Sequence, residues 1–149
     1  MGNVLFYHLT RSPAEALLPV LIGKSLAAGW RVELRGTDPG RMDWLDRQLW
    51  LGEGFLPHGL AGGLHDARQP VLLTMPGQAA GNDPACLMAC DGARVDSGEC
   101  DRFERTCIIF DGGDAGAVAY ARDQWKSLTG AGVTAEYWSE ESGRWERKR

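Results

Sequence analysis

The chain has 149 residues, of which 44% are hydrophobic and 24% are charged, and its formal net charge is −4. This composition suits one globular domain over residues 1–149 and excludes a disordered chain, a transmembrane helix and a protein that holds nucleic acid mainly through clustered cations. The first residues lack the long apolar core of a secretory signal, so we expect a cytoplasmic protein with reduced cysteines and no membrane contact.

The amino-terminal part of the chain has the pattern of a strand, a helix and a second strand. Aromatic and aliphatic residues predict a strand at Asn3–Leu9, and residues 30–34 alternate as a second strand would. Between them, Ser12 to Glu15 has the form of a capping box, and leucines follow at helical spacing as far as Gly29, a natural left-handed C-cap. Two strands joined by one helix are expected to be parallel, with a right-handed crossover.

Two more helices and four more strands follow. The helices are predicted over residues 40–51, capped by Asp38, and over residues 115–129. Strands are predicted at residues 70–74, 86–90, 106–110 and 134–139, and irregular structure at 55–63. The alternation of strands and helices predicts an α/β fold: a single domain with a mostly parallel open sheet and helices on both faces, Rossmann-like in outline.

Catalytic and metal-binding motifs are weak in this sequence. His58 stands in a glycine-rich loop without a nucleophile motif, and the four cysteines lack a C-x-x-C pair, which favours small buried thiols over a zinc site. The turn from Gly112 to Gly116 lacks phosphate-binding spacing, and its aspartates suit a helix start. We therefore expect no catalytic residue, cofactor or metal. The alternative is a small nucleotide-binding protein or enzyme that uses the His58 loop and this turn.

A basic and aromatic cluster is predicted on the last helix. Arg122 and Lys126 are four residues apart and therefore share a helical face, with Trp125 beside them. Residues 144–149 are cationic and contain Trp145, and such a combination suits a ligand with an apolar anchor and negative charge. Trp125 could equally be a core residue. A second apolar patch is predicted at Trp44 and Trp50 if the second helix faces outward, although Trp50 is expected in the core.

The order and spacing of several motifs resemble those of the chi subunit of bacterial DNA polymerase III holoenzyme. The motifs are FYHL at 6–9, FLPH at 55–58, FER at 103–105 before the strand TCIIFDG, ARDQWK at 121–126, YW at 137–138 and GRWERK at 143–148.

This resemblance implies a non-catalytic accessory protein of the clamp-loader assembly with a Rossmann-like fold. Members of the family bind the acidic tail, ending in Pro-Phe, of single-stranded-DNA-binding protein, and many bind a psi subunit that links them to the clamp loader. By position, the resemblance implies a tail site made of Val118, Arg122, Trp125, Lys126 and Trp145. Val118 stands where many members have a lysine, so one cation is missing there.

Overall fold

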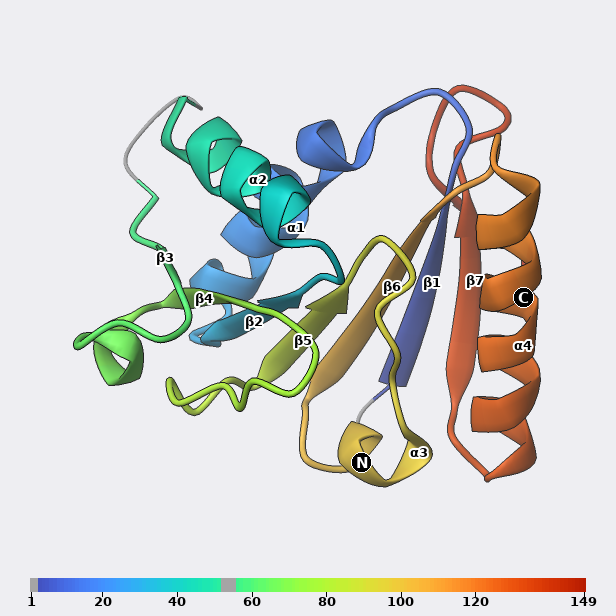
Figure 1. The fold of residues 1–149 in the computed structure, drawn as a ribbon. Helices are drawn as coiled ribbons and strands as arrows, with labels where there is room; N and C mark the ends of the chain where they lie inside the picture. Colours follow the sequence, from blue (N-terminus) through green and yellow to red (C-terminus); the bar gives the residue numbers. More distant parts are fainter. Residues whose placement is uncertain (1–2, 52–55) are drawn as a thin grey trace.

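The computed structural model describes residues 3–51 and 56–149, and Figure 1 shows a sheet with helices on its two faces. The strands of the described residues run in the order β3-β4-β2-β5-β6-β1-β7-β8. Their bounds are β1 (Asn3–Leu9), β2 (Val32–Arg35), β3 (Gly59–Leu60), β4 (Val71–Thr74), β5 (Cys86–Ala89), β6 (Arg105–Asp111), β7 (Ala135–Ser139) and β8 (Glu146–Arg147). The helices are α1 (Ala14–Ala27), α2 (Pro39–Leu51), α3 (Ser97–Cys100) and α4 (Ala115–Gly130), with a 3-10 turn at Asp66–Arg68.

The described strands pair in parallel, except that β8 is antiparallel to β7. This confirms the predicted α/β class and the mostly parallel open sheet. β1 and β2 are parallel, as expected of strands joined by a helix, but they are not neighbours, because β6 and β5 lie between them.

Side-chain alternation along the strands divides the core into two clusters. Leu5 and Tyr7 of β1 face the side covered by α1 and α2, whereas Phe6 faces the side covered by α4. On the α4 side, Leu128 is fully buried against the sheet. Both faces of a central parallel strand are therefore apolar, which is why the strand sequences read as nearly continuous hydrophobic runs.

Local signals predicted most element boundaries correctly. Asp38 accepts a hydrogen bond from the Arg41 backbone N–H at the start of α2, at 2.8 Å, and Gly29 has a φ of 85° just after α1. Asp114 caps α4 by accepting from the backbone N–H groups of Gly116 and Ala117. The four cysteines are buried free thiols, as their spacing suggested.

Two sequence expectations about local structure were wrong. Ser12 does not cap α1, whose N-cap is Pro13 without a side-chain hydrogen bond, because the Ser12 hydroxyl donates to the carboxylate of Glu140 instead, at 2.9 Å. Within 55–63, Gly59–Leu60 forms the edge strand β3, while Phe55 lies outside the described residues. Residues 144–149, the cationic end, contain strand β8.

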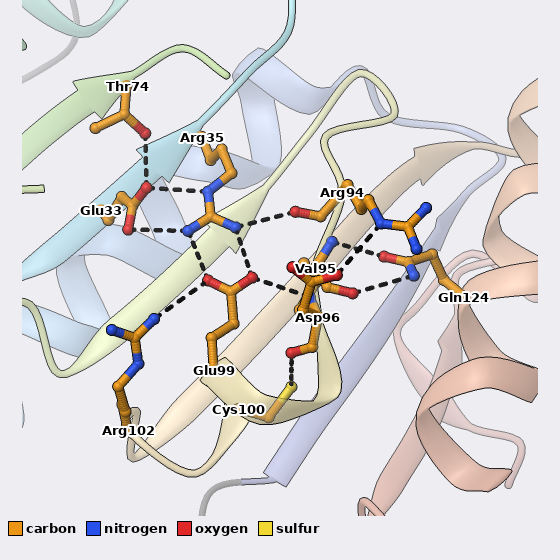
Figure 2. A network of polar contacts seen from close by, with 10 residues as sticks. All are labelled: Glu33, Arg35, Thr74, Arg94, Val95, Asp96, Glu99, Cys100, Arg102 and Gln124. Carbon is orange, nitrogen blue, oxygen red and sulfur yellow. Dashed lines mark hydrogen bonds and ion pairs between the residues drawn. The ribbon is translucent and has the colours of Figure 1, made fainter. Parts of the chain in front are cut away.

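A polar network fixes the loop that precedes α3 (Figure 2). The Arg35 guanidinium lies between the carboxylates of Glu33 and Glu99, at 3.0 and 2.8 Å. On α4, the Gln124 side-chain oxygen accepts from the backbone N–H of Val95 at 2.9 Å, and its amide donates to the carbonyl of the same residue at 3.2 Å. This paired contact ties α4 to the loop before α3, one residue from Trp125.

The described helices give no sign of a membrane span, because none of them combines the necessary length with sufficient apolar character.

Candidate functional site

A cavity of about 440 Å³ lies between α4, the ends of β1 and β6, strand β7 and the residues after β8. Its lining combines five residues of α4, three from the strands and two from the end of the chain: Val118, Ala121, Arg122, Trp125, Lys126, His8, Phe110, Tyr137, Lys148 and Arg149. Four of the five residues that the family resemblance implied, Val118, Arg122, Trp125 and Lys126, thus lie in one cavity. Successive turns of α4 bring these four side chains to the same face.

Trp125 belongs to the core and to the cavity at the same time. Its ring meets the edge of Phe6 at a centroid distance of 5.2 Å and lies 6.2 Å from the ring of Tyr137. The residue is only partly buried, and the cavity uses the part of the indole that the core leaves uncovered. Trp125 therefore packs against the core with one part of its side chain and lines the cavity with another.

The cavity is strongly cationic. Among the described residues its lining contains Arg122, Lys126, Lys148 and Arg149 and no aspartate or glutamate. Lys148 contacts the carboxylate of Glu146 at 3.4 Å, whereas the ion pairs found between described residues include none of the other three cations. An apolar hollow bordered by four cations, three of which have no acidic partner among the described residues, suits an anion that carries an apolar group.

His8 and Tyr137 form the inner wall of this cavity, and the sequence did not identify either as a site residue. The Nδ1 atom of His8 is hydrogen-bonded to the Tyr137 hydroxyl, and the imidazole stacks on Phe110 at 4.9 Å. Burial raises the pKa of Tyr137, so its phenol stays neutral at physiological pH. The parallel pairing of β1 with both β6 and β7 brings these three rings together, which no local sequence signal could predict.

Trp145 lies away from the cavity, which corrects the expectation that it joins the other four residues. It packs edge to face on Tyr7 at 5.4 Å, on the sheet face that α1 covers. Trp145 and Lys148 flank β8 on either side, and side chains alternate along extended chain, so these two residues, three apart, lie on opposite sides of the sheet. Trp145 instead contributes to a separate groove between α1 and β7.

The residues of the alternative, enzymatic interpretation have structural roles. His58 is 4% exposed, and its ring nitrogens lie 2.7 Å from the carbonyl of Leu56 and 2.9 Å from that of Asp46, which joins the loop to α2. In the turn from Gly112 to Gly116, Asp114 already occupies the first amides of α4. Neither feature therefore offers a group that is free to act on a substrate.

A larger cavity, about 720 Å³, opens at the carboxyl ends of β1, β5 and β6, where Rossmann-like folds hold nucleotides. Of the described residues, four carboxylates and one arginine line it, and this arginine, Arg41, is paired with Asp91 at 3.1 Å. The carboxylates are Glu15, Asp91, Asp111 and Asp114. This excess of negative charge opposes the binding of a phosphate.

The outer face of α2 is more exposed than the sequence suggested. Trp50 is 49% exposed, so the expectation that it belongs to the core was wrong, and Leu51 beside it is 77% exposed. Trp44 is partly exposed and stacks under the guanidinium of Arg41 at 4.8 Å. Together with Leu60 on β3, the end of α2 therefore presents an apolar patch.

Comparison of the sequence with known protein families gives a match that can be set beside this geometry. A family model described as DNA polymerase III chi subunit, HolC, matches residues 1–136 of the chain. No curated protein matches the chain at the significance required. The family match includes all of α4 and leaves out residues 137–149.

Proposed function

The chain belongs to the DNA polymerase III chi subunit family, and we propose that this accessory subunit of the polymerase binds the acidic C-terminal tail of single-stranded-DNA-binding protein through the cationic cavity on α4. The observation that carries the proposal is the charge of that cavity. Its lining combines an indole and a phenyl ring with four cations, and three of these cations have no carboxylate partner among the described residues.

The bound tail would use both properties of the cavity. Its terminal phenylalanine inserts between Val118 and Trp125, where aromatic and aliphatic carbons already meet. Arg122 and Lys126 hold the terminal carboxylate and the preceding aspartates by charge-assisted hydrogen bonds. This function consists of binding and involves no chemical reaction, so the subunit is non-catalytic and needs no cofactor.

The strength of this contact suits a linker between two assemblies. One aromatic anchor with a few exposed ion pairs gives an affinity in the micromolar range, on the order of −8 kcal/mol, which weakens as salt screens the charges. Single-stranded DNA coated with single-stranded-DNA-binding protein presents many tails close together. This raises the effective concentration of tails near the subunit, while each single contact can still dissociate. The subunit would thereby connect coated single-stranded DNA to the polymerase.

The apolar patch at the end of α2 is the candidate surface for a psi-like subunit. Trp50, Leu51 and Leu60 are each exposed on the part of the molecule formed by α2 and β3, and β3 lies at the opposite end of the strand order from β7 and the cavity. A partner on that patch would leave the tail site free, so the chain could hold both partners at once and link one to the clamp loader.

A pull-down tests the proposed function directly. Full-length single-stranded-DNA-binding protein should be retained by the immobilised chain, and a truncated form without its last few residues should pass through. Equal retention of both forms would contradict the proposal, because the tail would then contribute nothing to the contact.

A further inference from the structure

The end of the chain folds back onto the tail site. Strand β8 runs antiparallel to β7, and beyond it the backbone N–H of Lys148 donates to the carbonyl of Tyr137 at 2.6 Å, while the N–H of Tyr137 donates to the carbonyl of Arg149 at 3.3 Å. These bonds extend the sheet past β8 along the site's inner wall. In Figure 1 the marker of the C-terminus falls on α4. This segment is therefore part of the folded domain.

The Arg149 side chain lies over the central aromatic ring of the site. Its guanidinium carbon is 5.9 Å from the centroid of the Trp125 ring, a distance at which a cation and an aromatic face attract each other. Lys148 lines the same cavity. The cavity thus has cations on two sides: Arg122 and Lys126 on α4, and Lys148 with Arg149 on the returning segment.

Arg149 differs from the other cations of its own segment. Arg144 contacts Glu146 at 3.3 Å and Arg147 lies 3.8 Å from Glu136, whereas Arg149 has no carboxylate within ion-pair distance among the described residues. A guanidinium held on an indole keeps its N–H edge available for bidentate hydrogen bonds to a carboxylate. The hydrogen bonds and ion pairs found between described residues include none from the Arg149 guanidinium, so its donors are available to a ligand.

We propose that Arg149 is a second anion-binding group of the tail site, which pairs with an aspartate of the acidic peptide from the side opposite α4. The proposal rests on the proposed function and deepens it, because residues 137–149 lie outside the range that the family model matches. The returning segment would make the site a two-sided clamp on the peptide, and its extra charge would set how strongly acidic residues before the terminal phenylalanine contribute to affinity.

The test is a titration of a synthetic acidic peptide ending in Pro-Phe against variants of the full chain, at low ionic strength. Arg149→Ala should weaken binding about two- to fivefold, as expected of one exposed charge pair, and Arg149→Glu should weaken it about tenfold or more. Arg144→Ala removes the same type of residue from the same segment outside the cavity, and it should bind like the unmodified chain. A peptide with asparagines in place of its aspartates should bind the unmodified chain and Arg149→Ala equally.

Two outcomes separate this inference from the proposed function. If Trp125→Ala binds the peptide more weakly but Arg149→Ala binds it like the unmodified chain, the role of Arg149 is disproved and the α4 site stands. If Trp125→Ala also binds normally, the site itself is wrong. Circular dichroism of each variant checks that β8 and the rest of the fold are retained.

Discussion

Ser12 donates both its backbone N–H, at 2.6 Å, and its hydroxyl, at 2.9 Å, to the carboxylate of Glu140. The backbone N–H groups of Thr10 and Arg11 donate to the same carboxylate, at 3.1 and 2.8 Å. One buried side chain just after β7 therefore holds the connection between β1 and α1. Because β7 also carries Tyr137, this contact joins the strand that lines the cationic cavity to the beginning of α1.

Glu140→Gln should destabilise the fold by about 1–3 kcal/mol, since the amide can accept fewer of these hydrogen bonds and a charged acceptor is lost. Burial alone would raise the pKa of Glu140, but the donors from Ser12, Arg11 and Thr10 outweigh it and lower the pKa below its ordinary value. The stabilisation is therefore complete above about pH 4.3, the ordinary carboxyl pKa, and is lost as the pH falls through the lowered value. Urea unfolding at about pH 7 and at about pH 3 measures both effects.

The matched control is Glu141→Gln, because the Glu141 side chain is exposed and next in sequence. It should unfold like the unmodified chain at both pH values. If Glu140→Gln lost as much unfolding free energy relative to the unmodified chain at low pH as at pH about 7, the stabilisation could not come from the ionised carboxylate of Glu140.

Trp125→Ala and Arg122→Ala should each weaken binding of the acidic tail peptide several-fold while the domain stays folded. Trp125 supplies the apolar wall, and Arg122 supplies a cation with no internal carboxylate partner among the described residues. Lys126→Ala should mainly reduce the salt dependence of binding, as expected of a cation at the rim. Calorimetric titration gives the affinities.

Trp145→Ala is the control that the structure provides for this series. It removes an equally large aromatic side chain from the opposite face of the sheet, beside Tyr7. Its peptide affinity should equal that of the unmodified chain. A loss as large as that of Trp125→Ala would move the site away from α4.

Arg35→Ala should destabilise the fold by about 3–5 kcal/mol, because it leaves the largely buried carboxylates of Glu33 and Glu99 without their shared partner. Burial alone would raise the pKa of Glu99, but hydrogen bonds from Arg35 and from the Asp96 backbone lower it in the native protein. The native pair thus stabilises the fold above about pH 4.3 and less as the pH falls. The difference in unfolding free energy between Arg35→Ala and the unmodified chain should therefore become smaller in acid, because the carboxylates that Arg35 no longer pairs become protonated.

Arg102→Ala is the control for this network. Arg102 also approaches Glu99, at 3.9 Å, but its side chain is 73% exposed, so its removal should cost less than about 1 kcal/mol. Chemical unfolding of both variants side by side decides the comparison. If both variants lost the same unfolding free energy, the burial of the Arg35 ion pairs would not explain their contribution to stability.

Gly112→Ala should destabilise the protein by about 1–3 kcal/mol and should also weaken binding of the tail peptide. A Cβ atom at this position would lie 2.1 Å from Nε2 of His8 and 2.7 Å from the backbone oxygen of Leu9, so the His8 ring must move out of the site's wall. Gly23→Ala, where nothing lies within 4 Å of the added carbon, should leave peptide binding unchanged and stabilise α1 slightly. Thermal unfolding and peptide titration together distinguish the two glycines.

Nucleotides and dinucleotides should leave the melting temperature unchanged. The cavity where a Rossmann-like fold would bind them is lined by four carboxylates, and Asp114 already caps α4. A thermal-shift screen measures this, since a ligand that binds the native state raises the melting temperature by mass action. A rise of several degrees with one nucleotide would restore the alternative interpretation of the chain as a nucleotide-binding protein.

Local periodicity determined most of what the sequence revealed. The four-residue spacing of Arg122 and Lys126 placed them with Trp125 on one face of α4, because the pitch of a helix is the same in any fold. The apolar strand runs likewise predicted a sheet covered on both faces, and Asp38, Asp114 and Gly29 marked helix ends. These features depend only on residues a few positions apart.

Only the tertiary structure decided which distant residues join that face of α4. His8 and Tyr137 meet because β1 pairs with β7, and Arg149 reaches Trp125 because β8 returns along β7. Trp145 was misplaced because its side depends on the register of β8, which a single residue of shift would reverse. The pairings of β1 with β6 and with β7 join residues more than a hundred positions apart, and local propensity carries no information about such pairings.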